Sequence, residues 1–157
     1  TFRPRAMVTR AQMALFLARA LTGGTVPVHS GADTFWDVTS ASGAYDAIEY
    51  LAGEKVEMGY KDGHYGPTEQ LNRGQMAAFI ARSMVPIDQR PDLPGYTPPS
   101  TAPSFPDVPE TFAFYKPVEY IKEHGITGGY KADGRYHPEY VCTRDQMAVF
   151  VAKAFGL

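Results

Sequence analysis

Apolar residues recur at helical spacing in three segments of the chain, each directly after a residue that can cap a helix. Thr9, Asn72 and Thr143 precede these segments, and a Gln stands three residues after each of them. This spacing is typical of a capping box, in which the cap and Gln side chains bind each other's backbone N–H groups. The apolar positions form one buried stripe per predicted helix: Met13, Phe16 and Leu17; Met76, Phe79 and Ile80; and Met147, Phe150 and Val151.

The three segments are copies of one repeat. An Arg follows each cap, and an aromatic residue, any residue and Pro precede it, ending at Pro4, Pro67 and Pro138. Two more helices are predicted, around residues 45–52 and 114–123, with Gly53 placed to end the former. We expect each of these two helices to cover the capped helix that follows it in the chain.

The first copy has no such preceding helix. The stripe of Met13, Phe16 and Leu17 is therefore predicted to be an open apolar surface that serves self-association. We divide the chain into a half repeat at 1–21, a linker at 22–34, a full repeat at 35–84, a Pro-rich linker at 85–104 and a full repeat at 105–157. Because the chain opens inside a repeat, we expect it to be a processed or truncated product.

Composition narrows the function classes. A formal net charge of −2 over 157 residues gives no electrostatic attraction to nucleic acid or to an anionic membrane. The single cysteine excludes a disulfide framework within the chain, and no apolar run is long enough to cross a membrane. The four histidines share no metal or catalytic spacing, so we expect no cofactor, no metal and no enzymatic activity.

The ordered motifs resemble the S-layer homology family. The last repeat carries Phe105-Pro-Asp-Val, Gly125-Ile-Thr-Gly-Gly-Tyr, Asp133-Gly, Tyr136-His-Pro and Thr143-Arg, and the middle repeat carries most of the same elements. The resemblance implies a mostly α fold of helix-loop-helix repeats in a pseudo-threefold arrangement, here joined by Gly/Pro-rich linkers. It also implies a non-catalytic protein that holds to cell-wall polysaccharide, an acidic glycan. All three copies have Gln where the family usually has Glu.

Six residues are candidates for glycan binding. The resemblance implies that Arg10, Arg73 and Arg144 contact the glycan, and a helix N-terminus favours anions; each Arg could instead pack on a neighbouring unit or pair with Asp37 or Asp107. Trp36 could stack on a sugar or fill a gap between helices. Asp37 and Asp107 could contact a ligand, or serve a turn or a helix N-cap.

Two functions follow from these features. The first is a secreted, extracellular cell-surface or cell-wall protein that attaches to wall polysaccharide. The second is a self-assembling subunit of a filament, sheath or surface lattice, a homo-oligomer or polymer in which a neighbouring subunit completes the first repeat.

Overall fold

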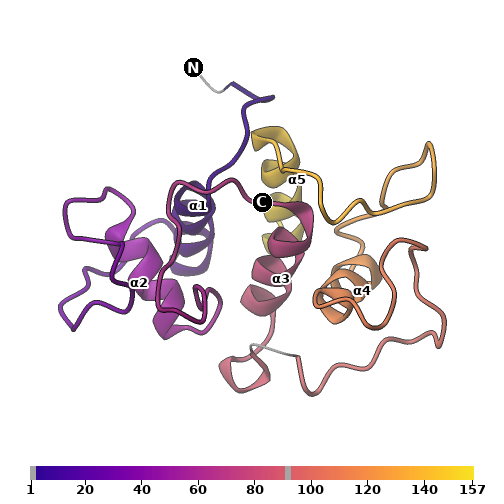
Figure 1. Ribbon diagram of the computed structural model, residues 1–157, viewed down its shortest axis with the longest axis horizontal. Coiled ribbons are helices and arrows are strands. Elements are labelled where there is room, and N and C mark those ends of the chain that lie inside the picture. The colour runs from indigo at the N-terminus through magenta and orange to yellow at the C-terminus, as the bar shows by residue number, and fades with distance from the viewer. Residues whose placement is uncertain (1–2, 91–92) are drawn as a thin grey trace.

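The computed structural model describes residues 3–90 and 93–157 and is helical (Figure 1). Over these residues it contains isolated β-bridges but no strand. The five α-helices are α1 (Arg10–Thr22), α2 (Tyr45–Gly53), α3 (Arg73–Met84), α4 (Tyr115–Glu123) and α5 (Arg144–Phe155), with one 3₁₀ turn, η1 (Ile87–Gln89). The mostly α fold predicted from the sequence is confirmed.

The helices lie close to their predicted positions. Pro117 falls in the first turn of α4, where its missing N–H costs no helical hydrogen bond. The predicted end of α2 is wrong by a residue or two, because Gly53 is still helical and Lys55 adopts the left-handed conformation that stops the helix, with φ 56°. In the last repeat Gly125 has that role, with φ 71°.

The predicted capping pattern is present at the start of the three repeated helices. The Thr9 and Asn72 side chains accept the N–H groups of Gln12 and Gln75, and both Gln side chains accept in return from the cap N–H. At α5 the Gln146 side chain again accepts from the Thr143 N–H, while the N–H of Gln146 is donated to Asp145 Oδ1.

A closed ring of backbone hydrogen bonds joins the segments that lead into α1, α3 and α5. Val8 donates its N–H to the Cys142 carbonyl at 2.9 Å, Cys142 donates to Leu71 at 2.8 Å, and Leu71 donates to Val8 at 2.9 Å. All three side chains are fully buried. The ring therefore ties together three segments that are far apart in the sequence and fixes where the three helices begin.

The next two N–H groups of each helix are also bound by a neighbouring repeat. Arg10 and Arg73 donate to the carbonyls of Glu69 and Tyr140, both at 2.9 Å, and Arg144 donates to Ala6 at 2.9 Å. The residues after them donate to the carbonyls of Pro67, Pro138 and Pro4. Backbone groups at a helix start need partners from outside the helix. Here the aromatic-x-Pro turns of the neighbouring repeats supply them.

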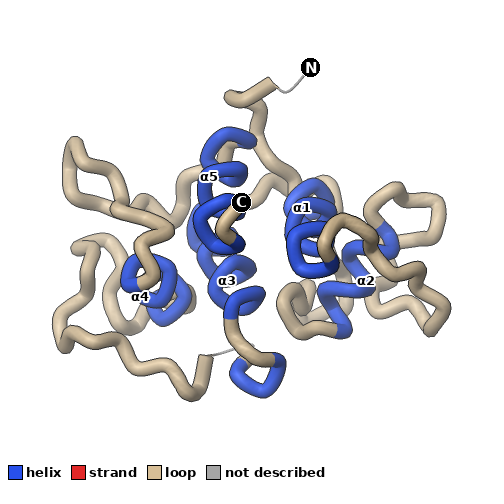
Figure 2. The backbone as a smooth tube through the Cα atoms, turned by 180° about the vertical axis from the view of Figure 1, so that it is seen from behind, coloured by secondary structure: helices blue, strands red, loops and turns tan. Residues whose placement is uncertain are grey.

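The helices pair differently from the prediction. α2 packs against α1 and α4 packs against α3, so α1 and α3 are each covered by the helix that follows them across a linker. Figure 1 and the reverse view in Figure 2 show α2 and α4 on the outer sides, with α1, α3 and α5 between them. The expected open stripe is therefore wrong for Met13 and Leu17, which are fully buried, whereas Phe16 is 36% exposed.

The exposed apolar face lies on α5 instead. Gly74 of α3 faces the Phe114 ring at the start of α4, and Ala78 one turn later is buried. Val149 is the counterpart of Ala78 on α5 and is 52% exposed. In the described part of the chain α5 contacts α1 and α3, and no helix covers it as α4 covers α3.

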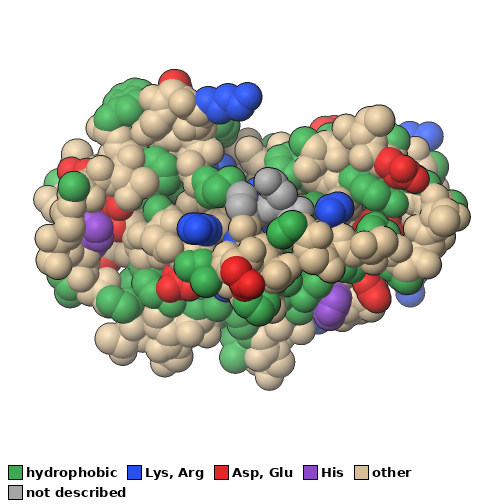
Figure 3. All heavy atoms as spheres, turned by 90° about the horizontal axis from the view of Figure 1, so that it is seen from below, with side chains coloured by type: hydrophobic (Ala, Val, Ile, Leu, Met, Phe, Trp, Pro, Cys, Tyr) green, Lys and Arg blue, Asp and Glu red, His purple; other side chains and the backbone are tan. Residues whose placement is uncertain are grey.

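The Pro-rich segment after α3 packs against the helices. Leu93 is buried, Lys116 of α4 donates to its carbonyl, and Tyr96 meets the ring of Tyr120 edge to face. On the face drawn in Figure 3, acidic and basic side chains are interspersed, in keeping with the small net charge. Among the described helices, none has the length and apolar character needed to span a bilayer.

The cap of α3 gives a test of the fold. Replacing Asn72 by Ala leaves the Gln75 N–H without its acceptor and should cost about 1 kcal/mol, or roughly 2–4 °C in the thermal midpoint. Asn72→Thr, which copies Thr9 and Thr143, is the control and should unfold near the wild-type temperature. Thermal unfolding followed by circular dichroism measures both. An Asn72→Ala protein as stable as the wild type would contradict the cap assignment.

Candidate functional site

Arg10 and Arg73 occupy equivalent buried positions at the first residues of α1 and α3. Each is only 4% exposed. Arg10 Nε donates to the Tyr65 carbonyl at 2.7 Å, and Arg73 Nε donates to the Tyr136 carbonyl at 2.8 Å. In return the Tyr136 hydroxyl donates to the Arg73 carbonyl at 2.8 Å. The aromatic residue of the turn and the Arg of the neighbouring helix therefore hold each other in place.

Aromatic rings surround both guanidinium groups. Arg73 Cζ lies 4.8 Å from the centre of the Tyr130 ring, 4.5 Å from Tyr136 and 5.6 Å from Phe150. Arg10 Cζ has the three equivalent neighbours from the repeat that follows it, namely Tyr60, Tyr65 and Phe79 at 4.6 to 5.3 Å. A cation over an aromatic face is stabilised by the ring quadrupole. Within the described residues neither Arg forms an ion pair, so the predicted pairing with Asp37 or Asp107 is wrong.

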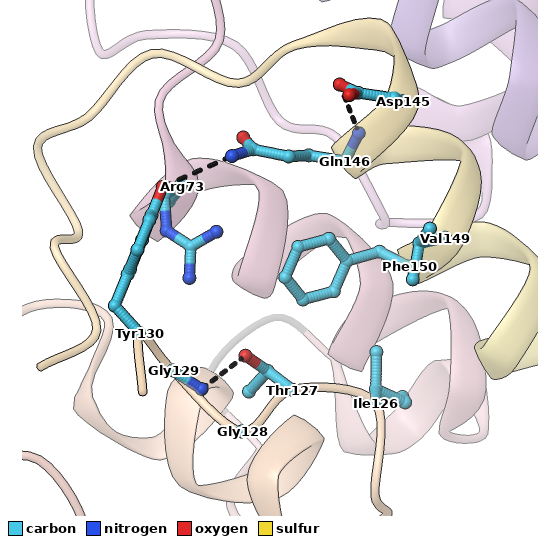
Figure 4. A pocket seen from close by; sticks show the side chains of 10 residues that line it. All are labelled: Arg73, Ile126, Thr127, Gly128, Gly129, Tyr130, Asp145, Gln146, Val149 and Phe150. Carbon is cyan, nitrogen blue, oxygen red and sulfur yellow. Dashed lines mark hydrogen bonds between the residues drawn. The ribbon is translucent and has the colours of Figure 1, made fainter. Parts of the chain in front are cut away.

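The Arg73 groove is a pocket of about 320 Å³ between the 126–130 loop and the first two turns of α5. Figure 4 shows the guanidinium lying between the rings of Tyr130 and Phe150. Gln146 Nε2 donates to the Tyr130 hydroxyl at 3.1 Å, and Thr127 Oγ1 accepts the Gly129 N–H at 3.2 Å. Polar groups and a cation thus line a cavity with aromatic walls, a combination suited to a polar ligand with an anionic group.

The Arg10 groove is built from the equivalent segments and is smaller, at about 230 Å³. Its wall includes Met58, and the Phe114 ring closes one side. Glu57 lies fully buried behind it, and its carboxyl group meets the Tyr65 hydroxyl. Burial raises the pKa of Glu57 to about 8, although the Arg10 and Arg82 guanidinium groups act in the opposite direction.

Arg144 is the third copy and is partly buried. Its backbone N–H joins the neighbouring turn at Ala6, as described above. Phe2, the aromatic residue of that turn, lies outside the described residues. Phe16 of α1 is the counterpart of Phe79 and Phe150 in the repeat pattern, and it is partly exposed.

Asp37 and Asp107 bind the aromatic-x-Pro turns that begin at the two buried tyrosines, Tyr65 and Tyr136. Asp37 accepts the N–H groups of Tyr65 and Gly66 at 2.7 and 2.8 Å, and Asp107 accepts those of Tyr136 and His137 at 3.0 and 2.7 Å. Burial disfavours the charged form of Asp107, yet these backbone hydrogen bonds lower its pKa. The N-cap role is wrong, since α2 and α4 begin several residues later. Each carboxylate instead holds a turn that lies 28 to 30 residues further along the chain.

Trp36 lies on the surface. Its side chain is 72% exposed, and its Nε1 donates to the Asp62 carbonyl at 3.3 Å. The expectation that Trp36 fills a gap between helices is therefore wrong. The exposed ring leaves the sugar-stacking prediction open.

Two of the four histidines, which share no metal or catalytic spacing in the sequence, lie beside the tyrosines of the grooves. His64 stacks on Tyr60, with ring centres 4.3 Å apart, and His137 lies 5.2 Å from Tyr130. Hydrogen bonds to Asp62 and Asp133 raise the pKa values of His64 and His137 respectively. The two histidines stand at different positions of the repeat, so no repeated motif marks them. Their place beside these tyrosines is seen only in the folded structure.

Asp107, His137 and Glu139 also come together, with one ligand atom of each within 4.8 Å of the others. His137 Nε2 lies 2.7 Å from Asp133 Oδ2, and both oxygens of Asp107 already accept backbone N–H groups. These hydrogen bonds already occupy His137 Nε2 and both Asp107 oxygens, which a cation would need as ligand atoms.

Comparison with known sequences supports the repeat assignment. The S-layer homology domain matches residues 34–77 and 104–148, which together exceed half of the chain. Both matched segments run from the Phe-x-Asp-Val opening into the next capped helix, so they contain the tyrosines of the two grooves.

Curated relatives contain a similar segment. The chain is 28% identical over 145 residues to an S-layer protein of Bacillus licheniformis and to S-layer protein EA1 of Bacillus anthracis, covering 90% of this chain and 15% of each relative. It is also 28% identical over 143 residues to an endoglucanase of Bacillus sp. strain KSM-635, covering 14% of that protein. The chain thus spans less than a sixth of these relatives. They indicate a protein of the cell surface or cell wall, and the matched repeats show that the chain belongs to the S-layer homology domain family.

Proposed function

We propose that this chain attaches to cell-wall polysaccharide by binding an anionic sugar in the groove around Arg73. The observation that carries the proposal is a buried guanidinium without an ion pair among the described residues, at the wall of an open pocket. A buried cation is costly unless an opposite charge or strong hydrogen bonds compensate it. An anionic group entering the pocket would provide that compensation.

The lining of the groove suits a sugar as well as an anion. The tyrosine ring offers an apolar surface, while its hydroxyl and the Gln146 amide can exchange hydrogen bonds with sugar hydroxyls. The backbone N–H groups at the helix starts do not provide the site, because neighbouring carbonyls and cap side chains already bind them. Binding therefore falls to the Arg side chain. Arg10, Arg144 and the exposed Trp36 belong to the same proposal as further contacts.

The arrangement of the repeats is also part of the proposal. The ring through Val8, Leu71 and Cys142 is what a pseudo-threefold relation among α1, α3 and α5 would produce. On this arrangement each groove lies where one repeat meets the next. The proposed role of the repeats is attachment, which involves no catalytic step.

A second candidate function is self-assembly, and the exposed face of α5 favours it. Val149 is exposed at the position where α3 has the buried Ala78. A neighbouring copy that covered this face would contact a different surface of its partner. Such a contact, repeated head to tail, gives a filament or lattice.

Polysaccharide binding can be tested with a charge placed in the groove. Gly128 is exposed, has φ outside the left-handed region, and has open space where a Cβ would be. Gly128→Asp should weaken retention by purified wall polysaccharide at least tenfold, because the new carboxylate lies beside Arg73 and repels the anion. Gly128→Ser is the neutral control. Equal retention of the wild type and both variants would argue against this groove as the site.

Self-assembly is tested by electron microscopy of the concentrated protein in negative stain. The wild type should form extended polymers, and Val149→Asp should disperse them by placing a charge in an apolar contact. Gly128→Asp should assemble normally, which separates assembly from glycan binding. Monodisperse wild-type particles across salt and pH conditions would rule the assembly out.

A further inference from the structure

The two grooves differ at one pair of neighbouring residues. Glu57 and Thr127 occupy equivalent positions after α2 and α4. The N–H of Glu57 donates to the Leu51 carbonyl and that of Thr127 to the Ile121 carbonyl, both at 3.3 Å. Both are buried, one as a carboxyl group and the other as a hydroxyl. The next residue is Met58 in the Arg10 groove and Gly128 in the Arg73 groove. The repeat thus places a titratable acid behind one groove only.

The hydrogen bonds around Tyr65 indicate the protonation state of Glu57. The Tyr65 hydroxyl lies within reach of two acceptors, Glu57 Oε2 and the Arg10 carbonyl at 3.1 Å, but it has one proton to donate. Both contacts are satisfied if Glu57 is protonated, donates to the tyrosine oxygen and leaves the tyrosine proton for Arg10. The other oxygen, Oε1, has no hydrogen-bond partner, which suits a neutral carboxyl group better than a carboxylate.

The charges facing Glu57 come from two helices. Arg10 of α1 and Arg82 of α3 both favour its ionised form, and burial opposes it. Tyr60 lines the groove, its hydroxyl donates to Glu69, and its ring stacks on His64. Behind the Arg73 groove, Thr127 presents a hydroxyl that accepts the Gly129 N–H. Asp145 lines that groove, with its carboxylate bound to the Gln146 N–H (Figure 4).

We propose that Glu57 sets the specificity of the Arg10 groove by competing with an anionic ligand for Arg10, so that this groove binds anions only while Glu57 is protonated and the Arg73 groove binds them independently of this proton. The inference rests on the proposed anion-binding function of the grooves. With Glu57 neutral, the Arg10 guanidinium is available to a ligand. Once Glu57 ionises, its carboxylate attracts the Arg10 guanidinium and competes with the ligand for it.

The pKa of about 8 places this change in the mildly alkaline range. Affinity at the Arg10 groove should therefore fall as the pH rises through that value. Loss of a charge-assisted contact should weaken binding at least about tenfold. His64 also has a raised pKa and lies at the same groove, so a variant at Glu57 is needed to separate the two groups.

The experiment isolates each groove by filling the other. Gly128→Trp fills the Arg73 groove and leaves the Arg10 groove, while Met58→Trp does the reverse, and both positions are exposed. Isothermal titration with tetragalacturonic acid, whose carboxylates stay ionised throughout, is run at about pH 6 and about pH 9. The Gly128→Trp protein should bind at least about tenfold more weakly at the higher pH. The Met58→Trp protein should lack this tenfold loss. His137 lies beside the Arg73 groove and also has a raised pKa, so any smaller change with pH in this protein should be unaffected by Glu57→Gln.

Adding Glu57→Gln to the Gly128→Trp protein should abolish the pH dependence, because Gln keeps the shape but cannot ionise. Two results would overturn the inference and leave the proposed function standing. One is an affinity at the Arg10 groove that does not change with pH, and the other is a pH dependence of that affinity that survives Glu57→Gln. Absence of binding by the wild type in either buffer and by every variant would instead count against anion binding by the grooves, and with it both proposals.

Thermal unfolding tests the titration of Glu57 without any ligand. A raised pKa means that the folded state favours the protonated acid, so the wild type loses stability as the pH rises from the ordinary pKa of 4.5 towards about 8. Glu57→Gln escapes that loss. Its midpoint should therefore gain on the wild type by several degrees between about pH 5 and about pH 8. A constant difference would show that Glu57 is not protonated in the fold.

Discussion

Three backbone hydrogen bonds close a ring through Val8, Leu71 and Cys142, and the rest of the structure is arranged around it. The ring joins the entry points of α1, α3 and α5, and the next N–H groups of each helix bind the turn of a neighbouring repeat. A helix start normally leaves several N–H groups to water or to a ligand. Here they hold the repeats together, so the contacts that build the fold also remove the helix ends as anion sites.

That constraint explains why Arg10 and Arg73 carry the chemistry. Each side chain is directed into the boundary between two repeats, where a tyrosine carbonyl fixes its Nε and aromatic rings surround the guanidinium. The rings and the carbonyl make burial of the cation tolerable without supplying an opposite charge. One arrangement therefore stabilises the junction and leaves a positive group at the wall of a pocket.

Repetition makes the differences between the grooves informative. The backbone of the two loops follows the same course, so a change of side chain alters the chemistry with little change in shape. Glu57 and Met58 give the Arg10 groove a buried acid and a smaller volume, whereas Thr127 and Gly128 leave the Arg73 groove larger and without that acid. On α5, Val149 is exposed where Ala78 is buried on α3.

The sequence alone determined the repeats, the five helices and the caps, because Thr9-x-x-Gln12 and its copies depend on contacts within one turn. It also identified Arg10 and Arg73 as the candidate residues. Which helix covers which was decided only by the tertiary structure: an apolar stripe shows that α3 needs a partner, and either α2 or α4, its neighbours in the chain, could provide it. The same holds for Glu57, whose protonation depends on burial and on Tyr65, Arg10 and Arg82 meeting there from distant segments. The spacing of cap and apolar residues within one helix can be read from the sequence, whereas desolvation and long-range contacts exist only once the chain has folded.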